Sequence, residues 1–351
     1  MACAPWHYHP LTAAWNLMRW AMLIALLLFA SAPVQAQPEA PSPPAASPET
    51  AGAAPEFPGT TSPIITDSAL AQAYQSCTVQ ITPAMTCIGG AFNRGWQRQG
   101  VAANLPVGHH TQQQRAAEGN YRYLQVQVEV YYGLTPRCTA SVVAPFRQNW
   151  AGQVGPTGQA DSAGGFANPM LRLRYVLVDG GAAAATLTGY FAVTFPLGAS
   201  LHPPPPLLSV DQTGQGAFGF TWGLNIFRYV PQVPVLLYAN LWYTNYTNST
   251  FHGPRTYYED QLTVNFALEF PLTKSPENRW AFLLEVLSTS DIGRVFGPPA
   301  NQGTSLMINA LPALEFLPSS WFRLAAGVPV SVLGKNAFFN YTPTLACFIS
   351  F

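Results

Sequence analysis

Apolar and polar residues alternate at every second position along much of the chain from about Tyr121 onward. In 121–132 the apolar residues alternate with a mainly polar set. The apolar ones are Leu124, Val126, Val128, Val130 and Tyr132, and those between them are Gln125, Gln127, Glu129 and Tyr131. Successive side chains of a strand point to opposite faces, so this pattern predicts β-strands with one apolar face. The same alternation recurs in 170–178, 262–270 and 306–316.

The predicted strands are longer than those of most soluble domains. Most run about 10 to 14 residues, the length with which a tilted strand crosses a bilayer, whereas soluble strands are nearer five or six. We expect them at 121–132, 137–148, 168–179, 182–195, 215–229, 233–246, 257–270, 279–290, 304–316, 321–333 and 339–351.

Short and long connections alternate between these strands. The short ones are 133–136, 180–181, 230–234, 274–278 and 318–320, and the long ones are 149–167, 196–214, 247–256 and 291–303. Outer-membrane barrels combine tight periplasmic turns with longer outer loops in this way. If Phe351 ends in the periplasm, one outward strand must precede 121–132, and the only room is near 90–103, around Trp96. The count predicts an all-β, antiparallel transmembrane barrel of twelve strands.

The composition agrees with a surface that does not face water. Only 9% of residues are charged and 48% are hydrophobic, with 13% aromatic and a net charge of +0. Globular domains carry about 25% charged residues, and nucleic acid needs a basic footprint that is missing here. No apolar run of about 18 residues follows the N-terminal region. The chain therefore has no further candidate for a transmembrane helix. Apart from such helices, a closed β-barrel is the structure that satisfies every backbone hydrogen bond in lipid.

The N-terminus predicts export to the bacterial outer membrane. Arg19 precedes the apolar run 20–30, and small residues at Val34 and Ala36 complete a cleavage signal. We expect 1–36 to be a cleaved signal peptide that carries the chain through the inner membrane, with the start codon at Met1 or Met18 left open.

The rest of the chain divides into three predicted regions. Residues 37–63 read as a Pro/Ala-rich disordered linker, and 64–88 as a short periplasmic segment. Cys77 and Cys87 could form a disulfide in the oxidising periplasm. The barrel is expected to occupy 89–351.

Charged residues on the predicted inward face are candidates for lining the lumen. They are Glu129, Arg137, Arg172, Arg174, Glu269, Arg279, Glu285, Glu315 and Arg323. Hairpin neighbours face one another, so pairing is expected of Glu129 with Arg137 and of Glu315 with Arg323. Two interpretations stay open: the charges neutralise one another and fill a narrow lumen, or they line a selective pathway.

The last strand carries an expected assembly signal. Leu345, Cys347, Ile349 and Phe351 are apolar at every second position, and Phe351 is the last residue. A terminal aromatic residue on such a strand resembles the signal that the barrel-assembly machinery recognises. The expected partners are therefore this machinery and the lipid bilayer.

Several motifs resemble the bacterial family "MetA-pathway of phenol degradation", which contains outer-membrane transporters. The first is the run EVYYGLTPR from Glu129 to Arg137, which leads on to Val142-Val-Ala-Pro145. In order along the chain follow 164–169, 194–198, 280–285 and 323–330. The Gly-rich turn at 164–169 lacks the Asp of the family. The resemblance covers 121–351 and implies a twelve-stranded barrel for small, often aromatic or apolar, compounds. It does not carry phenol itself over to this chain.

The sequence shows no enzymatic constellation, and no cofactor or metal is expected. There is no G-x-S-x-G, HExxH or Gly-rich phosphate loop. His109 and His110 are adjacent in a predicted outer loop, where neighbouring side chains point apart. We therefore predict a channel or transporter for small, apolar or aromatic solutes. The alternatives are a plugged structural or surface-binding barrel and, disfavoured by its histidine placement, an outer-membrane hydrolase.

Overall fold

The computed structural model describes residues within the unit Glu56–Phe351. The described residues are 63–92, 95–99, 120–154, 159–180, 184–197, 213–214, 216–230, 233–249, 256–273, 279–295 and 304–351. The predicted signal peptide 1–36 lies outside the described residues, as do His109 and His110. So does the predicted linker, except for its last residue, Pro63. Among the described residues no helix is long and apolar enough to cross a membrane.

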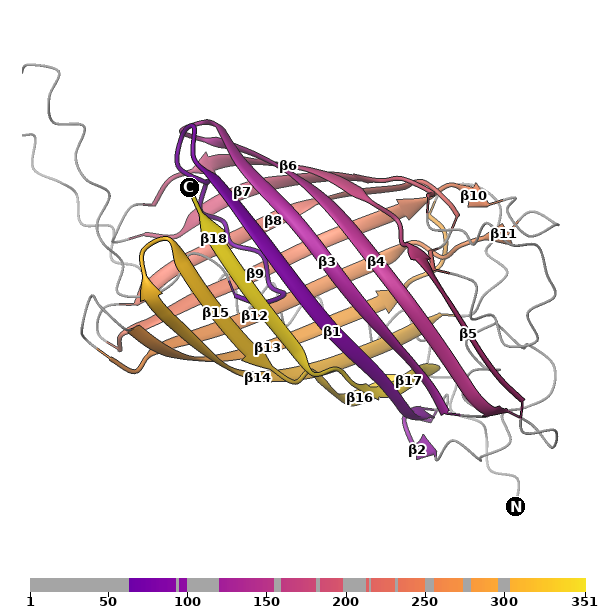
Figure 1. The fold of residues 1–351 in the computed structure, drawn as a ribbon. Helices are drawn as coiled ribbons and strands as arrows, with labels where there is room; N and C mark the ends of the chain where they lie inside the picture. Colours follow the sequence, from indigo (N-terminus) through magenta and orange to yellow (C-terminus); the bar gives the residue numbers. More distant parts are fainter. Residues whose placement is uncertain are drawn as a thin grey trace, which may run out of the picture. The chain divides into compact units, whose positions relative to one another are not determined.

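All described strands except two short ones form one antiparallel sheet, in which neighbours along the chain pair with each other (Figure 1). The long single strands are β1 (Cys77–Phe92), β3 (Asn120–Thr135), β4 (Cys138–Val154), β7 (Thr186–Thr194), β8 (Gly219–Val230), β9 (Val235–Tyr246), β12 (Gln261–Pro271), β13 (Arg279–Asp291) and β14 (Ser305–Ser319). Three more are each interrupted once: β5 (Gln159–Phe166) with β6 (Met170–Val178), β15 (Phe322–Gly327) with β16 (Val330–Lys335), and β17 (Ala337–Tyr341) with β18 (Thr344–Ser350).

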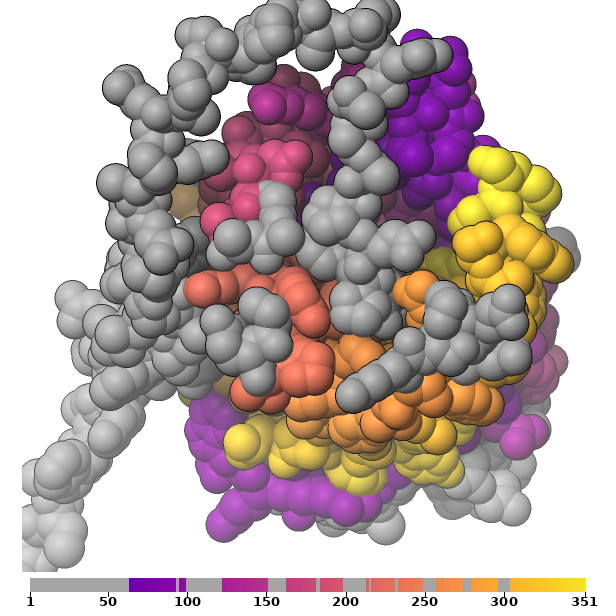
Figure 2. All heavy atoms as spheres, turned by 90° about the vertical axis from the view of Figure 1, so that its left-hand side faces the viewer, coloured from indigo at the N-terminus to yellow at the C-terminus, as the bar shows by residue number. Residues whose placement is uncertain are grey.

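Pairing of the first and last strands closes the sheet into a twelve-stranded barrel. β1 pairs with β3 on one side and with β17 and β18 on the other. At the end of this seam Phe351 donates its N–H to the Cys77 carbonyl at 2.8 Å, and Cys77 donates back at 3.2 Å. Figure 2 views this end, where the indigo residues of β1 lie beside the yellow residues of β18. The predicted fold class is confirmed.

The inward and outward faces follow the predicted alternation. On β3, Glu129 is buried while its neighbours Val128 and Val130 are exposed on the outer face. Most of the exposed large side chains on the strands are apolar, as lipid contact requires, and many buried inward positions are Thr, Asn, Glu or Arg. The inside of the barrel is therefore its polar side.

The prediction for the first strand is wrong in position. The strand before β3 is β1, Cys77–Phe92, which overlaps 90–103 at its last residues alone. Among the described residues of that region, Arg98–Gln99 (β2) pairs with it. The inward Gln80 and Thr86 alternate with outward residues such as Ile81. Pro83 and a bulge between Ile88 and Gly90 interrupt the pattern and conceal it. The barrel thus begins about twelve residues before the predicted boundary at 89.

The predicted disulfide is also wrong. Cys77 and Cys87 lie in the same extended strand, where ten residues at about 3.3 Å each separate them far beyond disulfide reach. Both thiols are free, as are those of Cys138 and Cys347.

One predicted long loop is mostly strand. Residues 149–167 contain the last part of β4 and all of β5, which pair from Phe146 to Val154. In the loop predicted at 247–256, Asn248–Ser249 (β10) pairs with Thr256–Tyr257 (β11) as a small ribbon.

Candidate functional site

Residues 63–76, called the inner segment below, lie against inward-facing side chains of the barrel rather than outside it. Their side chains include Ala69 and Ser68, which are 0% and 2% exposed. The segment meets the wall at the end where β1 starts and β18 finishes. This is the end with the short turns, which in outer-membrane barrels faces the periplasm. The predicted periplasmic segment from residue 64 is therefore inside the lumen up to Gln72, whereas Ala73, Tyr74 and Gln75 are exposed at its end.

A tight reversal leads from the inner segment into β1. Gln75 donates its N–H to the carbonyl of Gly133 at 2.9 Å, and Gly133 donates to Ser76 at 3.1 Å. Gln75 has a φ of 60°, in the left-handed region. Gly133 is required here, because a Cβ on it would lie 2.0 Å from the carbonyl oxygen of Ala73.

The Glu285 carboxylate of β13 holds the start of the inner segment. It accepts hydrogen bonds from the backbone N–H groups of Ile64 at 2.8 Å, Ile65 at 3.2 Å and Thr66 at 2.7 Å. Glu285 is fully buried. A buried carboxylate needs such donors to offset its loss of water. These backbone groups supply them.

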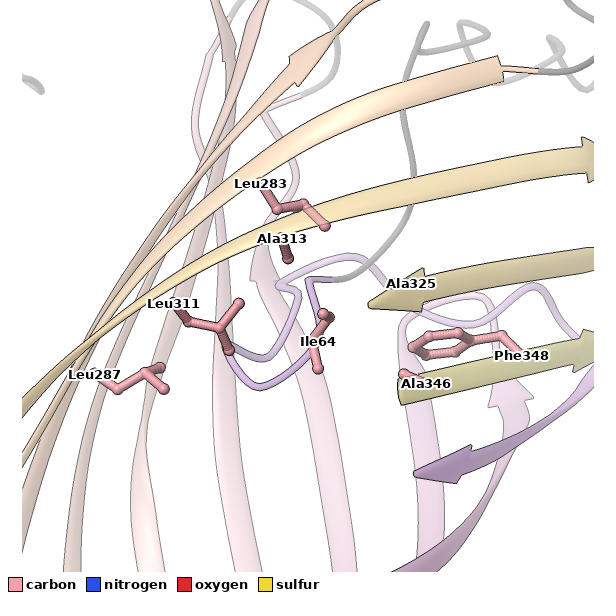
Figure 3. Close-up of a cluster of buried hydrophobic side chains, with 8 residues drawn as sticks. All are labelled: Ile64, Leu283, Leu287, Leu311, Ala313, Ala325, Ala346 and Phe348. Carbon is pink, nitrogen blue, oxygen red and sulfur yellow. The ribbon is translucent and has the colours of Figure 1, made fainter. Parts of the chain in front are cut away.

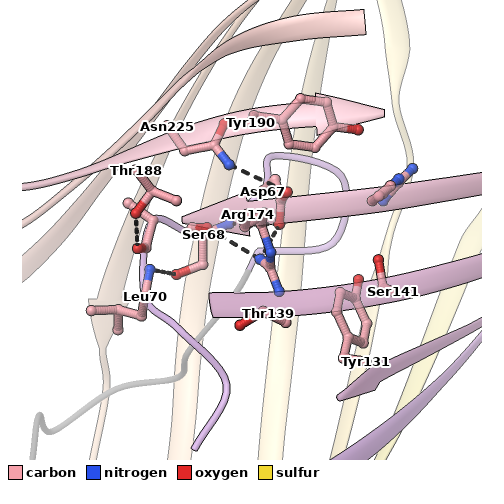
Figure 4. Close-up of polar contacts among 12 residues, drawn as sticks. Asp67, Ser68, Leu70, Tyr131, Thr139, Ser141, Arg174, Thr188, Tyr190 and Asn225 are labelled. Carbon is pink, nitrogen blue, oxygen red and sulfur yellow. Dashed lines mark hydrogen bonds and ion pairs between the residues drawn. The ribbon is translucent and has the colours of Figure 1, made fainter. Parts of the chain in front are cut away.

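Asp67 is the centre of the polar contacts on the opposite wall (Figure 4). One carboxylate oxygen lies 2.7 Å from Arg174 Nη1, and the other accepts from Asn225 Nδ2 at 3.3 Å. Asn240 accepts the Asp67 N–H and donates to the Asp67 carbonyl, both at 2.8 Å. Arg174 also donates to the Ser68 carbonyl at 3.2 Å. Three strands, β6, β8 and β9, thus converge on one residue.

The rest of the segment is held by hydroxyl groups and by two apolar clusters. Thr188 donates to the Ala69 carbonyl, and Thr139 accepts the Gln72 N–H. Ile64 packs into one cluster of wall side chains (Figure 3), made of Leu283, Leu287, Leu311, Ala313, Ala325, Ala346 and Phe348. Ala69 and Leu70 pack against the other, made of Phe227, Leu236, Tyr238, Ala267 and Tyr229.

Four of the predicted lumen charges form ion pairs within the wall. Arg172 donates from one nitrogen to both oxygens of Glu129, at 2.9 and 3.0 Å, and Ser141 donates to the same carboxylate. Arg323 lies 3.2 Å from Glu315, as the hairpin position predicts, and its guanidinium lies over the Phe348 ring.

The remaining predicted charges differ in their surroundings. Glu269 is buried and accepts a hydrogen bond from Tyr238 at 2.8 Å. Arg279 is partly buried at the start of β13. Arg137 lies exposed in the turn between β3 and β4, so the pairing of Arg137 with Glu129 was wrong; Arg172 of β6 takes that place.

Aromatic side chains lie beside the Asp67 contacts. Trp242 donates its indole N–H to Asn225 Oδ1 at 2.7 Å and stacks on Tyr190 with ring centroids 4.8 Å apart. The Arg174 guanidinium lies 5.1 Å from the centroid of the Tyr131 ring. The polar groups that hold Asp67 are therefore bordered by three aromatic rings.

An apolar pocket lies in the wall near the seam. Its volume is about 680 Å³, and its lining includes the outward-facing, exposed Leu314 and Leu345 together with Pro83, Pro312 and Pro343. Proline has no N–H for the strand ladder. The pocket thus lies where the sheet is weakened, and it opens on the outer face.

Acidic side chains gather at the opposite, long-loop end. Asp260 accepts from Tyr243, Asn245 and the Val295 N–H, and Asp291 accepts from Ser305. Burial, with the nearby Asp291 and Asp260, raises the pKa of Glu259 above its ordinary value. Within the described part of the chain no group of His, Cys, Asp and Glu is arranged to hold a metal ion.

These features define a twelve-stranded outer-membrane β-barrel whose lumen contains a segment of its own chain. A solved structure with this fold is the COG4313 outer membrane channel from Pseudomonas putida F1: TM-score 0.61, 12% identity, 81% of this chain and 98% of that chain covered.

More distant barrels are the beta domain of the Bordetella autotransporter BrkA (TM-score 0.47, 10% identity, 79% of this chain and 99% of that chain) and the CymD monoaromatic hydrocarbon channel (TM-score 0.40, 7% identity, 80% and 90%). No family model and no curated protein matches the sequence.

Proposed function

We propose that this protein is an outer-membrane channel for small, apolar or aromatic solutes, and that the inner segment closes its periplasmic half. The observation that carries the proposal is the segment's attachment. Much of it consists of hydrogen bonds between wall side chains and the segment's backbone, and no disulfide among the described residues adds to them. Such bonds contribute about 1 kcal/mol each, or more where a charge takes part. They are reversible.

The size of the barrel supports a pathway. Eight strands enclose a space that side chains alone can fill, and the interior widens with each added strand. In this twelve-stranded barrel a piece of backbone occupies the interior, so its withdrawal would leave an open lumen. The P. putida barrel with the same fold is itself an outer membrane channel.

The apolar or aromatic character of the solute rests on different support. Tyr131, Tyr190 and Trp242 face the lumen beside the inner segment. These rings would favour solutes with an apolar body, in agreement with the family that the sequence resembles.

A reversible cross-link tests the channel. In a background with the native cysteines replaced by serine, Ala69→Cys and Thr188→Cys would tie the segment to β7, since Thr188 already bonds to the Ala69 carbonyl. Proteoliposome swelling with small neutral solutes should be slow when oxidised and recover on reduction. The single variant Thr188→Cys is the control, and its flux should not depend on the redox state.

The plugged structural barrel predicts another outcome. Neither the reduced nor the oxidised protein would then pass solute above the level of empty liposomes. That result would reject the channel.

A further inference from the structure

We propose that Arg174 and Asn225 form a binding site for the carboxylate of a small aromatic acid, which takes the place that Asp67 occupies in the closed barrel. The inference rests on the proposed function, because a solute can reach this site only when the inner segment moves. It adds a charged group to the expected solute and assigns the residues that recognise it.

The charges around Arg174 supply the first step. The ionisable groups that act on it are Asp67, Tyr131, Glu129 and Arg172. Arg172 is already paired with Glu129, so Asp67 alone balances Arg174. Glu285, the other carboxylate that binds the segment, faces the backbone of residues 64–66.

Withdrawal of the segment would therefore leave the positive charge of Arg174 without its carboxylate partner. The Arg174 side chain is 8% exposed while Asp67 is in place, and opening costs the free energy of this ion pair. An anion that enters as Asp67 leaves would remove this cost. Opening and anion binding are thus coupled.

The geometry of the contacts selects a carboxylate among anions. Arg174 and Asn225 bind different oxygens of Asp67, at 2.7 and 3.3 Å, which suits a planar group with two oxygens. Asn225 is itself oriented by Asn240 and Trp242, which both donate to its Oδ1. Asn225 is therefore in place before a ligand binds.

The surrounding rings select an aromatic body for the ligand. Tyr131 lies under the Arg174 guanidinium, and the Tyr190–Trp242 stack borders Asn225. Figure 4 shows Tyr131 and Tyr190 on two sides of the Asp67–Arg174 pair. Aromatic rings attract one another in offset or edge-to-face geometry. An aromatic acid would bury its ring here while its carboxylate replaced that of Asp67.

Chemical rescue with sodium benzoate tests the site on the full chain in detergent. Asp67→Ala removes the internal carboxylate, and benzoate should bind this variant at least tenfold more tightly than the wild type. It should also raise the variant's melting temperature. Acetate should act in the same direction but more weakly, and benzamide, its neutral analogue, should not act. Asp291→Asn, which removes a carboxylate away from the segment, should resemble the wild type.

A second variant keeps the test valid if Asp67→Ala fails to fold. Asp67→Asn with Arg174→Met removes both charges together, so no buried charge is left alone, and it should abolish benzoate binding. Equal benzoate affinity in the wild type and Asp67→Ala would overturn the proposal, as would equal binding of benzamide. Benzoate binding is measured without a membrane, so it is independent of the flux assay. Solute flux without benzoate binding would reject this site and leave the channel standing. Benzoate binding without solute flux would reject the channel and leave the site standing.

Discussion

Asp67 and Arg174 are 107 positions apart in the chain, and their side chains meet at 2.7 Å inside the barrel. The pair joins a segment that precedes the first strand to the middle of β6. The charge of Arg174 is therefore balanced by a part of the same chain that is not a part of the wall.

Replacement of Glu285 by glutamine should loosen the inner segment. The amide has one acceptor oxygen in place of two, and its NH₂ group opposes the N–H groups of Ile64 and Thr66. Hydrogen bonds to a charged group contribute about 1.5–3 kcal/mol, so we expect a loss of about that size. Limited proteolysis should cut residues 63–76 faster, and single-channel recordings should show more open time. Unchanged rates in both assays would contradict the holding role of Glu285, and Asp291→Asn serves as the control.

Gly133→Ala should displace the reversal that leads into β1. A Cβ at Gly133 would lie 2.0 Å from the Ala73 carbonyl oxygen, so the segment has to move away. Gly189→Ala is a matched control on another strand, because its Cβ would meet Leu177 at an ordinary 3.6 Å. Cysteine labelling at position 73 should become faster in Gly133→Ala and not in Gly189→Ala. Equal labelling would mean that the reversal tolerates the methyl group.

Arg323→Met should destabilise the barrel by about 3–5 kcal/mol, because Glu315 would remain charged, 1% exposed and without its cation. The double variant Glu315→Gln with Arg323→Met should recover most of this loss. The shift from folded to unfolded mobility on heated gels measures both. If the double variant were as unstable as the single one, packing of Arg323 on Phe348 would be the larger contribution.

Glu259→Gln should stabilise the long-loop end at neutral pH. Burial and two nearby carboxylates raise the pKa of Glu259, so ionising it costs free energy in the folded state. The wild type should therefore lose stability as pH rises from the ordinary carboxyl pKa through the raised one. The variant should melt about 2 °C higher at pH 7 and equal the wild type at pH 4. A difference that is constant with pH would exclude titration of Glu259 as the cause.

Removal of Phe351 should reduce assembly more than stability. If Phe351 is the assembly signal that the sequence predicts, the amount of barrel in the outer membrane should fall several-fold. The purified variant should refold in detergent with nearly the wild-type melting temperature, since it loses two hydrogen bonds to Cys77. A large drop in melting temperature with normal membrane levels would assign Phe351 a structural role instead.

The barrel could be predicted because its signal is repeated and local. Alternation such as that around Glu129 recurs in strand after strand. It arises because one face of the wall contacts lipid and the other contacts the polar interior. β1 was missed because Pro83 and the bulge before Gly90 break the period, and its two cysteines suggested a disulfide. A local pattern could not show what fills the lumen. Asp67 resembles any polar residue of a linker until Arg174, Asn225 and Asn240 are brought around it by closure of the sheet.

The position of the inner segment, directly before β1, also bears on how the chain folds. Almost every pairing in this sheet joins neighbours in sequence and can form early, whereas β1 must find β18 across nearly the whole chain. The strand that makes this last, slow contact is the one to which the segment is attached. Closure of the wall therefore also fixes the point from which the segment enters the interior.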